Sequence, residues 1–332
     1  MEKLKIGVIG TGHLGKLHTK MFGQLQNCEL SGIFDTNPEN LANVAKEFNT
    51  KAFGSFEEML SAVDAVSIAV TTSAHYQVAR ECLLNNKHVF IEKPITSSIP
   101  QGEEIVKIAA DNNLTIQVGH IERFNPALLA VEHYLNEPMF IQSDRLSQFN
   151  PRGTDVAVVL DLMIHDIDII LSLINSDVSR IDANGMAIVS DNIDIANARI
   201  QFANGAVANV TASRISQKKM RKMRLFQKEN YISLDFIGGV AEVYRLVSAE
   251  QPLYTPAISF GEIGIGDKKK RVVYEQPEIK EINALKYELG LFVKSVTEKI
   301  KPVVSGEDGL KALRVAEIII QKIEESKIKA QL

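Results

Sequence analysis

The first third of the chain alternates between short apolar runs and stretches in which apolar residues recur at helical spacing. The apolar runs predict five buried strands: Lys5–Ile9, Leu30–Phe34, Ala65–Ala69, His88–Ile91 and Thr115–Val118. The helical stretches are His13–Leu25, Pro38–Phe48, Phe56–Ser61, Ala74–Asn85 and Ser98–Asn112. Strands that alternate with helices predict a parallel sheet covered by helices on both faces. We expect residues 1–121 to form this doubly wound α/β domain.

The pattern changes after residue 121, where strands separated by turn signals predominate. The predicted strands are Phe140–Leu146, Ile181–Ala187, Ile195–Phe202, Val207–Ser213, Met223–Gln227, Tyr231–Phe236 and Ala241–Leu246. The predicted helices are Asn125–Leu135, the strongly apolar Leu160–Leu173, Glu281–Lys299 and Gly309–Ser326, with an irregular segment at 250–280. Asn204-Gly205 is a hairpin signal. We expect residues 122–332 to form an α+β domain with a mostly antiparallel sheet, whose last helix is open to packing back on the first domain.

Composition limits the functions that the chain can have. It has 332 residues, 45% hydrophobic and 23% charged, as in a globular protein of two domains. A formal net charge of −4 argues against general binding to nucleic acid or anionic membranes. No apolar run approaches the roughly 20 residues that span a bilayer, and no signal peptide is visible. The two cysteines, Cys28 and Cys82, are too few for a disulfide framework, so we expect a cytoplasmic protein.

A glycine-rich turn follows the first strand directly and opens the first helix, with the sequence Gly10-Thr11-Gly12-His13-Leu14-Gly15. Gly10 permits a tight turn, Gly12 lets a pyrophosphate approach the backbone, and Gly15 allows close packing of helix and strand. The N–H groups at the helix start, including those of His13 and Leu14, then receive the phosphate charge. The alternative is a glycine turn in an unrelated α/β protein.

Asp35 ends the second strand, 20 residues after Gly15. At this place a carboxylate accepts hydrogen bonds from the adenosine ribose of a dinucleotide. It also repels a 2′-phosphate, so NAD is favoured over NADP. The competing interpretation is that Asp35 is only a turn residue before Thr36-Asn37-Pro38. The turn and Asp35 together predict a dinucleotide-binding domain.

Two further elements suggest a reaction centre. Glu92-Lys93-Pro94 stands at the carboxyl end of the fourth strand, the edge at which open parallel sheets bind ligands. There Lys93 can donate a hydrogen bond to a substrate oxygen, although an exposed loop salt bridge is the alternative.

The second element is a polar stripe on the apolar helix Leu160–Leu173. Asp161, His165 and Asp168 fall at i, i+4 and i+7, which places them on one face. Charged groups on a buried helix are costly unless they are paired or functional. A histidine held beside an acidic group suits acid–base catalysis on an alcohol, and a satisfied core histidine is the alternative. A metal site would need a third ligand, and none appears at a recognisable spacing, so we predict no metal.

Taken together, these motifs resemble the glucose–fructose oxidoreductase / inositol dehydrogenase / rhizopine-catabolism (Gfo/Idh/MocA) family over essentially the whole chain. The matching segments are GTGHLG, Thr71-Thr72 with His75, NKHVFIEKP, DLMIHDID and SGEDGLKAL. The resemblance implies a Rossmann domain followed by a domain with a large, open, mostly antiparallel sheet. That sheet often forms the subunit interface, so a homodimer or homotetramer through it is expected.

The resemblance also implies roles for individual residues. Lys93 and His165 would contact the reacting hydroxyl, and Asp161 would help to position the substrate. His165 is the acid–base group in many members, whereas Lys93 serves in others. Thr71 and Thr72 would contact the cofactor, and His75 and Glu92 would lie near its nicotinamide end.

The likeness has one departure and one more specific part. Many members carry glycines before and within the Asp-x-x-x-His motif, where this chain has the bulkier VAVVLDLMIH. The segment GHIERFNPAL, which contains Arg123 and Asn125, resembles the branch of UDP-N-acetylglucosamine 3-dehydrogenases. That branch implies oxidation of a carbon-3 hydroxyl on an N-acetyl sugar nucleotide. Asn125 would contact the substrate, and Arg123 and Arg152 would meet its diphosphate, because guanidinium groups suit phosphate oxygens; a surface arginine is the alternative for each.

A basic run places six cations between Arg214 and Arg224: Arg214, Lys218, Lys219, Arg221, Lys222 and Arg224. We interpret it as a solvated hairpin between two strands, with a phosphate-bearing substrate or an acidic partner as alternatives. The predicted protein is an NAD-dependent oxidoreductase that acts on a sugar, UDP-N-acetylglucosamine-like, hydroxyl carbon. Competing functions are a free-sugar or inositol dehydrogenase, a ring reductase, and a non-catalytic NAD-sensing regulator.

Overall fold

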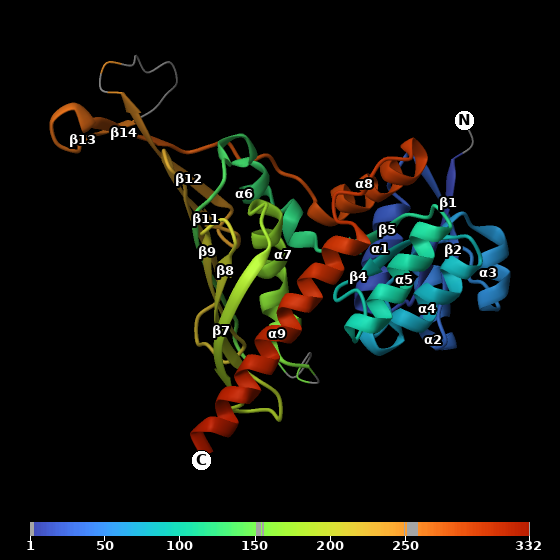
Figure 1. Cartoon of the computed structure of the whole chain (residues 1–332). Coiled ribbons are helices and arrows are strands. Elements are labelled where there is room, and N and C mark those ends of the chain that lie inside the picture. The colour runs from blue at the N-terminus through green and yellow to red at the C-terminus, as the bar shows by residue number, and fades with distance from the viewer. Residues whose placement is uncertain (1–2, 151–153, 155, 249, 251–257, 332) are drawn as a thin grey trace. The chain divides into compact units, whose positions relative to one another are not determined.

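The chain divides into two compact units. The computed structural model describes residues 3–150, 154, 156–248, 250 and 258–331. Unit 1 comprises Met1–Ile121 and Asn283–Arg314, and unit 2 comprises Glu122–Ile282 and Val315–Leu332. The two-domain expectation assigned everything after residue 121 to the second domain, whereas the contacts group 283–314 with the first unit. The chain therefore returns to unit 1 near its end (Figure 1).

Unit 1 is built on a parallel sheet of five strands in the order β2-β1-β3-β4-β5. The strands are β1 Leu4–Ile9, β2 Cys28–Phe34, β3 Ala65–Ile68, β4 His88–Glu92 and β5 Ile116–Gly119. The helices between them are α1 His13–Phe22, α2 Pro38–Phe48, α3 Phe56–Ala62, α4 Thr72–Leu84 and α5 Ile99–Asp111. Every strand and helix predicted for this region is present, with small differences at the ends.

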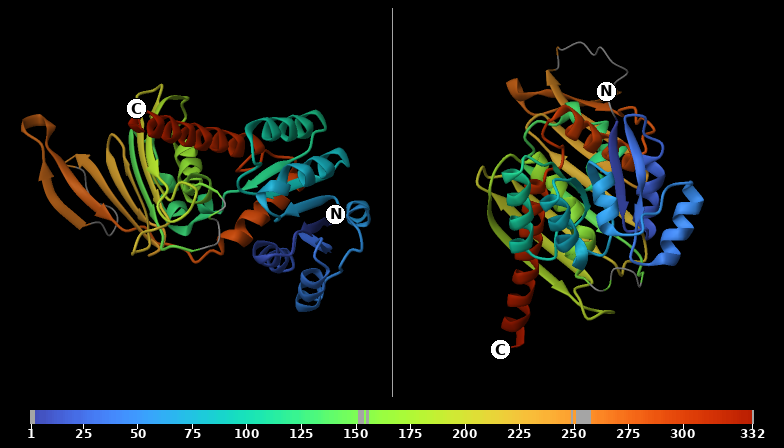
Figure 2. Two further views of the ribbon diagram at one scale, coloured as in Figure 1. Left: turned by 90° about the horizontal axis from the view of Figure 1, so that it is seen from below. Right: turned by 90° about the vertical axis from the view of Figure 1, so that its right-hand side faces the viewer.

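The strand order reverses direction between β1 and β3. The connection through α1 runs from β1 to β2, and the connection through α4 runs the opposite way, from β3 to β4. Because such crossovers are right-handed, α1 and α4 cover opposite faces of the sheet. Helices lie on both sides of it in the two views of Figure 2. The carboxyl edge at this reversal is where doubly wound sheets bind their ligands.

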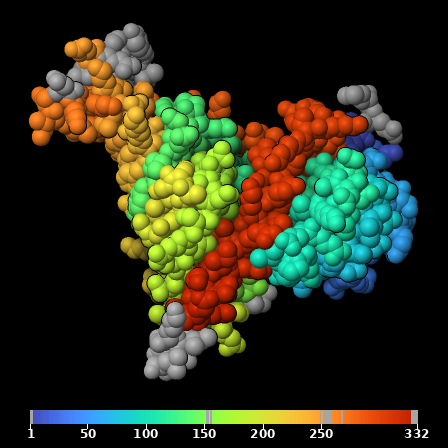
Figure 3. Space-filling view, viewed as in Figure 1, coloured from blue at the N-terminus to red at the C-terminus, as the bar shows by residue number. Residues whose placement is uncertain are grey.

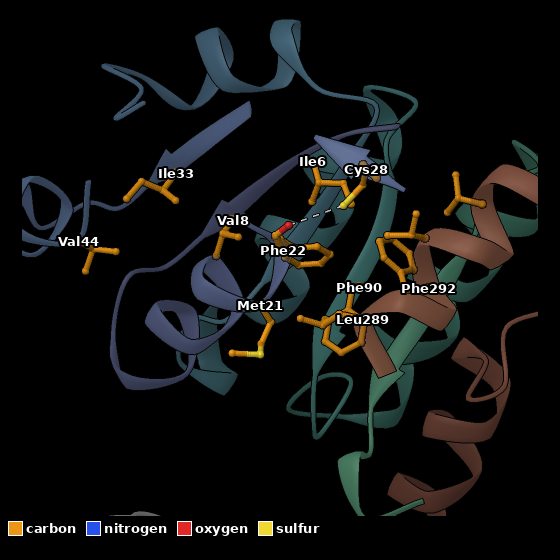
Figure 4. Packing of buried hydrophobic residues seen from close by; sticks show 13 residues of the cluster. Ile6, Val8, Met21, Phe22, Cys28, Ile33, Val44, Phe90, Leu289 and Phe292 are labelled. Carbon is orange, nitrogen blue, oxygen red and sulfur yellow. Dashed lines mark hydrogen bonds between the residues drawn. The ribbon is translucent and has the colours of Figure 1, made fainter. Parts of the chain in front are cut away.

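The core of unit 1 explains why residues 283–314 belong to it. Helix α8, Ala284–Glu298, contributes Leu289 and Phe292 to the cluster that also contains Phe22 of α1 and Phe90 of β4 (Figure 4). The rings of Phe90 and Phe292 meet edge to face, with centroids 5.8 Å apart. Burying an aromatic side chain of this size contributes about 1.5–3 kcal/mol. The apolar face of α8 thus has its partner in unit 1.

Unit 2 contains a sheet of nine strands in the order β13-β14-β12-β11-β10-β6-β9-β8-β7. The strands are β6 Phe140–Leu146, β7 Val178–Met186, β8 Ile195–Phe202, β9 Val207–Ser213, β10 Met220–Phe226, β11 Asn230–Asp235, β12 Val240–Ser248, β13 Ile258–Ile263 and β14 Lys270–Glu275. Among these pairings only β6 with β9 is parallel, so the predicted mostly antiparallel sheet is confirmed. Asn204-Gly205 does form the β8–β9 turn, with Gly205 at φ +88°.

Three predictions for unit 2 are wrong in detail. Segment 250–280 was predicted to be irregular, but its described part contains the strands β13 and β14. Strand β13 is exposed throughout and therefore lacks the alternation of apolar and polar residues that predicts a strand. The predicted helix Asn125–Leu135 is broken into α6, Pro126–Leu129, and the 3₁₀ turn η2, Glu132–Tyr134. The break lies at residues 130–131, and the side chains of Gln227 and Asn230 both donate hydrogen bonds to the carbonyl oxygen of Tyr134, where η2 ends.

The third correction concerns the apolar helix. Helix α7, Ile164–Leu173, is preceded by a π-helical turn, η3, over Val159–Met163, so the first part of the predicted α-helix is π-helical instead. Helix α7 packs against β6 and β9 on the buried face of the sheet (Figure 1). Single π-turns inside helices are frequent at functional sites.

The last helix, α9, runs over Gly306–Gln331 and so begins in unit 1 and ends in unit 2. In unit 2 it passes close to β7, because a Cβ on Gly185 would stand 3.0 Å from the side chain of Ile323. Figure 3 shows α9 in red beside the yellow-green strands. None of the helices in the described part of the chain is long and apolar enough to cross a bilayer.

Candidate active site

The glycine turn has a distinct steric reason at each glycine. Gly10 has φ +88°, and a Cβ there would stand 2.6 Å from the carbonyl oxygen of Ala69. A Cβ on Gly15 would stand 1.8 Å from the carbonyl oxygen of Gly10. Around Gly12, in contrast, no atom lies within 4 Å of the Cβ position. The turn is therefore closely packed at Gly10 and Gly15 and open at Gly12.

A cavity of about 800 Å³ lies beside this turn at the carboxyl edge of the sheet. Gly12, His13, Leu14, Asp35 and Thr71 are among the residues that line it. No side chain caps the first turn of α1, so its N–H groups remain available to a phosphate. The cavity volume, the open Gly12 and the uncapped helix start all fit a dinucleotide.

Asp35 is held in place at the wall of this cavity. Its Oδ2 accepts hydrogen bonds from the backbone N–H of Thr11 at 2.5 Å and from the Thr11 hydroxyl at 2.8 Å. Its Oδ1 accepts one from the N–H of Asn37 at 2.8 Å, in the turn that leads to α2. Asp35 therefore does serve as a turn residue, and its carboxylate also faces the glycine turn. Its bond to a ribose remains a prediction.

The Glu92-Lys93-Pro94 segment lies at the end of β4, with Lys93 half-buried. His75 of α4 is buried, with Nδ1 2.8 Å from the carbonyl oxygen of Pro94 and Nε2 3.3 Å from that of Val70. Burial lowers the pKa of His75, outweighing its hydrogen bonds and the charge of Glu92. The neutral ring has one N–H, and the shorter distance assigns it to Pro94. His75 thus holds the backbone beside Lys93, and the expected nicotinamide contact stays a prediction.

The two threonines are placed at the start of α4. Thr71 is the residue before its first turn, and its hydroxyl lies 3.2 Å from that of Ser73. The carbonyl oxygen of Thr72 accepts a hydrogen bond from Ser97. Of the two, Thr71 lines the cavity, so it has the better access to a cofactor.

In unit 2 the polar stripe of the apolar helix separates into two parts. Asp161 lies in the π-turn and His165 in the first turn of α7, and both are half-buried. Asp168 is 1% exposed and pairs with Arg123. Asp168 is therefore held in an ion pair with Arg123, and Asp161 and His165 are the members of the stripe that remain candidates for catalysis.

The predicted substrate-binding residues have other contacts. The guanidinium of Arg123 is bound by Asp168, so a phosphate would compete with a buried carboxylate. The Asn125 Oδ1 accepts a hydrogen bond from the N–H of Ala127 and so caps α6. Arg152 lies outside the described residues. Contact of these residues with a substrate is untested.

The basic run is not a hairpin, since β9 and β10 both pair with β6 and not with each other. Its first member, Arg214, is 3% exposed and donates to the Asp194 carboxylate at 2.9 Å. Burial alone would raise the pKa of Asp194, but hydrogen bonds from the N–H groups of residues 188–190 and the Ser190 hydroxyl lower it overall. Arg214 also donates a hydrogen bond to the carbonyl oxygen of Val156 and so holds the backbone shortly before η3, the turn that contains Asp161.

Two buried clusters were not predicted from the sequence. Arg145, 2% exposed, donates to Asp166 and to Glu122 from the interior of unit 2. Burial would lower the pKa of Arg145, but the two carboxylates outweigh it and raise that pKa. In unit 1, His18 of α1 lies 3.0 Å from Glu92. The signal for His18 was a histidine on the apolar face of α1, three residues after Gly15. No group of three or more metal-binding side chains is found among the described residues.

Comparison with known proteins identifies the family and the fold of the chain. The model of the oxidoreductase family with an NAD-binding Rossmann fold matches residues 4–120, and the GFO/IDH/MocA C-terminal domain matches residues 131–232. The UDP-N-acetylglucosamine 3-dehydrogenase of Acidithiobacillus ferrooxidans is 37% identical over 74% of this chain and 78% of its own. Its solved structure superposes with a TM-score of 0.87 at 31% identity, covering 98% of this chain and 99% of that one.

More distant relatives share the fold. The myo-inositol 2-dehydrogenase of Thermotoga maritima is 25% identical over 98% of this chain and 97% of its own. A levoglucosan dehydrogenase, solved with NADH and L-sorbose, has a TM-score of 0.82 at 19% identity and covers 98% of both chains. The chain belongs to the GFO/IDH/MocA family and is an NAD-dependent oxidoreductase.

Proposed function

We propose that this protein oxidises the carbon-3 hydroxyl of a UDP-N-acetylglucosamine-like sugar nucleotide to a ketone, with NAD as the hydride acceptor. The observation that carries the proposal is the 37% identity to a UDP-N-acetylglucosamine 3-dehydrogenase across 78% of that relative. The fold similarity to the same relative, at a TM-score of 0.87, supports it.

Each residue of the candidate site has a proposed part in this reaction. The N–H groups that follow Gly12 bind the pyrophosphate, and Asp35 binds the adenosine ribose. When bound, NAD accepts the hydride that leaves the alcohol carbon. His165 takes the hydroxyl proton as general base, and Asp161 helps to orient the substrate. Lys93 stabilises the developing alkoxide with its charge.

A second candidate is oxidation of a free sugar or an inositol. It is favoured by the ion pair between Arg123 and Asp168, because the guanidinium group that was expected to bind a diphosphate is already bound by a carboxylate. The 25% identity to a myo-inositol 2-dehydrogenase over nearly the full chain agrees with it.

A substrate panel distinguishes the two candidates. The purified protein is incubated with NAD and either sugar nucleotides or free sugars and polyols, and the absorbance of the reduced nicotinamide is followed. We expect UDP-N-acetylglucosamine to give the fastest signal. The Lys93→Ala variant should lose about 10²–10³-fold in turnover, as is usual when a group that stabilises a developing oxyanion is removed. A signal from a polyol and from no sugar nucleotide would replace the first candidate with the second.

We also propose that unit 2 associates with a second copy through the open face of its sheet, giving a homodimer or homotetramer. A row of aromatic rings crosses five neighbouring strands: Phe140, Phe226, Tyr231, Tyr244 and Tyr274. Successive centroids are 4.7–5.5 Å apart, and Phe226 is 40% exposed. The other four rings are half-buried, and a partly exposed aromatic row of this kind favours an interface.

Light scattering after gel filtration tests this association. The Phe226→Glu/Tyr244→Glu variant should be monomeric, because two carboxylates would be buried in the interface. Lys107→Glu on α5 is the control. An unchanged mass in the double variant would contradict this interface.

A cytoplasmic location is proposed on the state of the thiols. Cys28 and Cys82 are both free and buried, and burial raises the pKa of Cys28 to about 11. Such thiols suit a reducing compartment. Cell fractionation with an antibody tests this location.

A further inference from the structure

Three polar side chains lie in contact in a row inside unit 1, beneath the segment that carries Lys93. The Ser67 hydroxyl lies 2.8 Å from Nδ1 of His18, and Nε2 of His18 lies 3.0 Å from Oε1 of Glu92. Ser67 and His18 are 0% exposed and Glu92 is 9% exposed. Ser67 belongs to β3, His18 to α1 and Glu92 to β4, so the row joins three elements.

The two contacts of the His18 ring differ in kind. Nε2 lies 3.0 Å from Oε1 of Glu92 but is not aligned for a hydrogen bond, so this contact is electrostatic. Nδ1 and the Ser67 hydroxyl, in contrast, form a hydrogen bond of 2.8 Å. The His18 ring is therefore oriented by Ser67 on one side and faces the Glu92 carboxylate on the other. The order serine–histidine–carboxylate occurs in hydrolases, but a fully buried Ser67 cannot meet a substrate, so nucleophilic catalysis is excluded.

Glu92 is fixed from a second side by a glycine. A Cβ on Gly119 of β5 would stand 3.0–3.1 Å from all three carboxyl-group atoms of Glu92. Burial alone would raise the pKa of Glu92, but His18, Lys93 and His75 together outweigh it and lower that pKa. Glu92 is therefore a buried, ionised carboxylate, held by His18 and directly followed by Lys93.

The same segment is held from the opposite face of the sheet. His75 of α4 donates to the carbonyl oxygen of Pro94, and α4 lies across the sheet from α1. Residues 92–94 are thus fixed by one histidine at each end. Both histidines come from helices whose first turns adjoin the cofactor cavity, at Gly12 and at Thr71.

We propose that His18 is a positioning residue of the reaction: through Glu92 it fixes the place of Lys93, and Ser67 fixes the orientation of its ring. This inference rests on the proposed role of Lys93. It makes α1 a direct link between the cofactor turn and Lys93, so the two parts of the site are held in one geometry by the interior of unit 1.

Three variants test the proposal. His18→Phe keeps an aromatic ring beside Phe90 but removes the hydrogen bond to Ser67 and the contact with Glu92, and His18→Gln keeps a polar N–H group that can reach Glu92. Ser67→Ala removes only the hydroxyl. We expect His18→Phe to lower kcat about 10–100-fold, with KM for NAD changed less than about twofold. His18→Gln should recover most of kcat, and Ser67→Ala should lie between wild type and His18→Phe.

These variants distinguish a positioning role of His18 from a purely structural one. A folded His18→Phe with normal kcat, or equal losses in His18→Phe and His18→Gln, overturns the proposal. If His18→Phe does not fold, His18→Phe/Glu92→Gln replaces it, because no buried charge is then left unpaired. The same loss of kcat is expected there, and normal turnover overturns the proposal.

A second readout needs no substrate. Lysines carrying ¹³C-methyl labels keep their charge, and the Lys93 signal is identified by its absence in Lys93→Arg. This signal should move in His18→Phe and stay near its place in His18→Gln. If no substrate in the panel is oxidised, the proposed function fails while this measurement still decides the positioning role. A Lys93 signal that is unmoved in His18→Phe refutes it.

Discussion

Arg123 donates two hydrogen bonds of 2.7 Å each to the carboxylate of Asp168, and Asp168 is 1% exposed. The pair joins the turn after β5 to helix α7. Removing the arginine alone would leave a buried charge without its partner, which costs about 3–5 kcal/mol.

We therefore expect Arg123→Met to lower the free energy of unfolding of the chain by about 3 kcal/mol, measured by urea titration. Arg123→Met/Asp168→Leu should recover much of the loss, because neither charge remains. Arg180→Met is the matched control, since Arg180 and Asp182 form an exposed pair worth about 0–1 kcal/mol. A small effect of Arg123→Met would mean that the arginine is available for a diphosphate.

Substitution by alanine should affect the stability of the fold strongly at Gly15 and little at Gly12. Gly15→Ala places a Cβ 1.8 Å from the backbone oxygen of Gly10, which no side-chain rotation relieves, so about 3 kcal/mol of stability should be lost. Gly12→Ala meets no atom within 4 Å, so the free energy of unfolding should change by less than about 1 kcal/mol.

The Gly12→Ala variant should nevertheless bind NAD much more weakly, because its methyl group occupies the space through which the pyrophosphate reaches the backbone. Calorimetric titration with NAD beside urea unfolding separates the two effects. Unchanged NAD affinity in Gly12→Ala would place the pyrophosphate elsewhere.

Asp35 should set the preference for NAD. In Asp35→Ala the affinity for NAD should fall about 10–100-fold, because hydrogen bonds to a charged group are worth about 1.5–3 kcal/mol. Binding of NADP should improve relative to NAD, since the carboxylate no longer repels the 2′-phosphate. Glu39→Gln, an exposed change in the first turn of α2, is the control. The prediction is wrong if the NADP-to-NAD ratio of affinities is the same in both variants.

The stability of the fold should fall in mild acid, partly because of His88. Burial lowers the pKa of His88 below 6.5, with the charge of Asp64 acting in the opposite direction. The unfolded chain therefore takes up a proton near pH 6.5 that the folded chain resists. This contribution is present in full above pH 6.5 and is lost as the pH falls below it.

Protonation of Nδ1 would also remove the hydrogen bond that His88 accepts from the N–H of Thr115 at 2.9 Å. His88→Asn keeps an acceptor and does not titrate, so urea unfolding between pH 5 and 8 should show a shallower fall than in wild type. His133→Asn, at an exposed position, should leave the profile unchanged. A wild-type slope in His88→Asn would assign the acid sensitivity to other groups.

Unit 1 could be predicted well because its signals are local. Apolar runs of strand length and the steric demands of Gly10 and Gly15 act over a few neighbouring residues. Strand β13 escaped prediction because its side chains are exposed, and it shows a register shift between Ser259 and Glu262. The 3₁₀ turn η2, where an α-helix was predicted, ends at Tyr134 in hydrogen bonds from Gln227 and Asn230, which lie far along the chain.

The residues of the candidate site also fall into those that local sequence signals predict and those that depend on distant contacts. The glycine turn, Asp35 and Lys93 follow from strand ends, which a sequence pattern reveals. Helical periodicity predicted that Asp168 lies on a polar stripe. Its partner Arg123 is 45 positions away, and the helical pattern cannot identify a partner outside the helix. His18 carried a visible signal, yet its meaning depends on Glu92, which another strand brings to it.

The contact between Phe90 and Phe292 has a consequence for how the protein is made. The nascent chain releases Phe90 from the ribosome long before Phe292, and translation at about 5–20 residues per second separates them by on the order of ten seconds or more. During that interval the sheet of unit 1 lacks the helix that covers this part of its apolar face. The emerging chain must then avoid aggregation with an incomplete core, which makes residues 1–121 a natural client for chaperones until the C-terminal helices arrive.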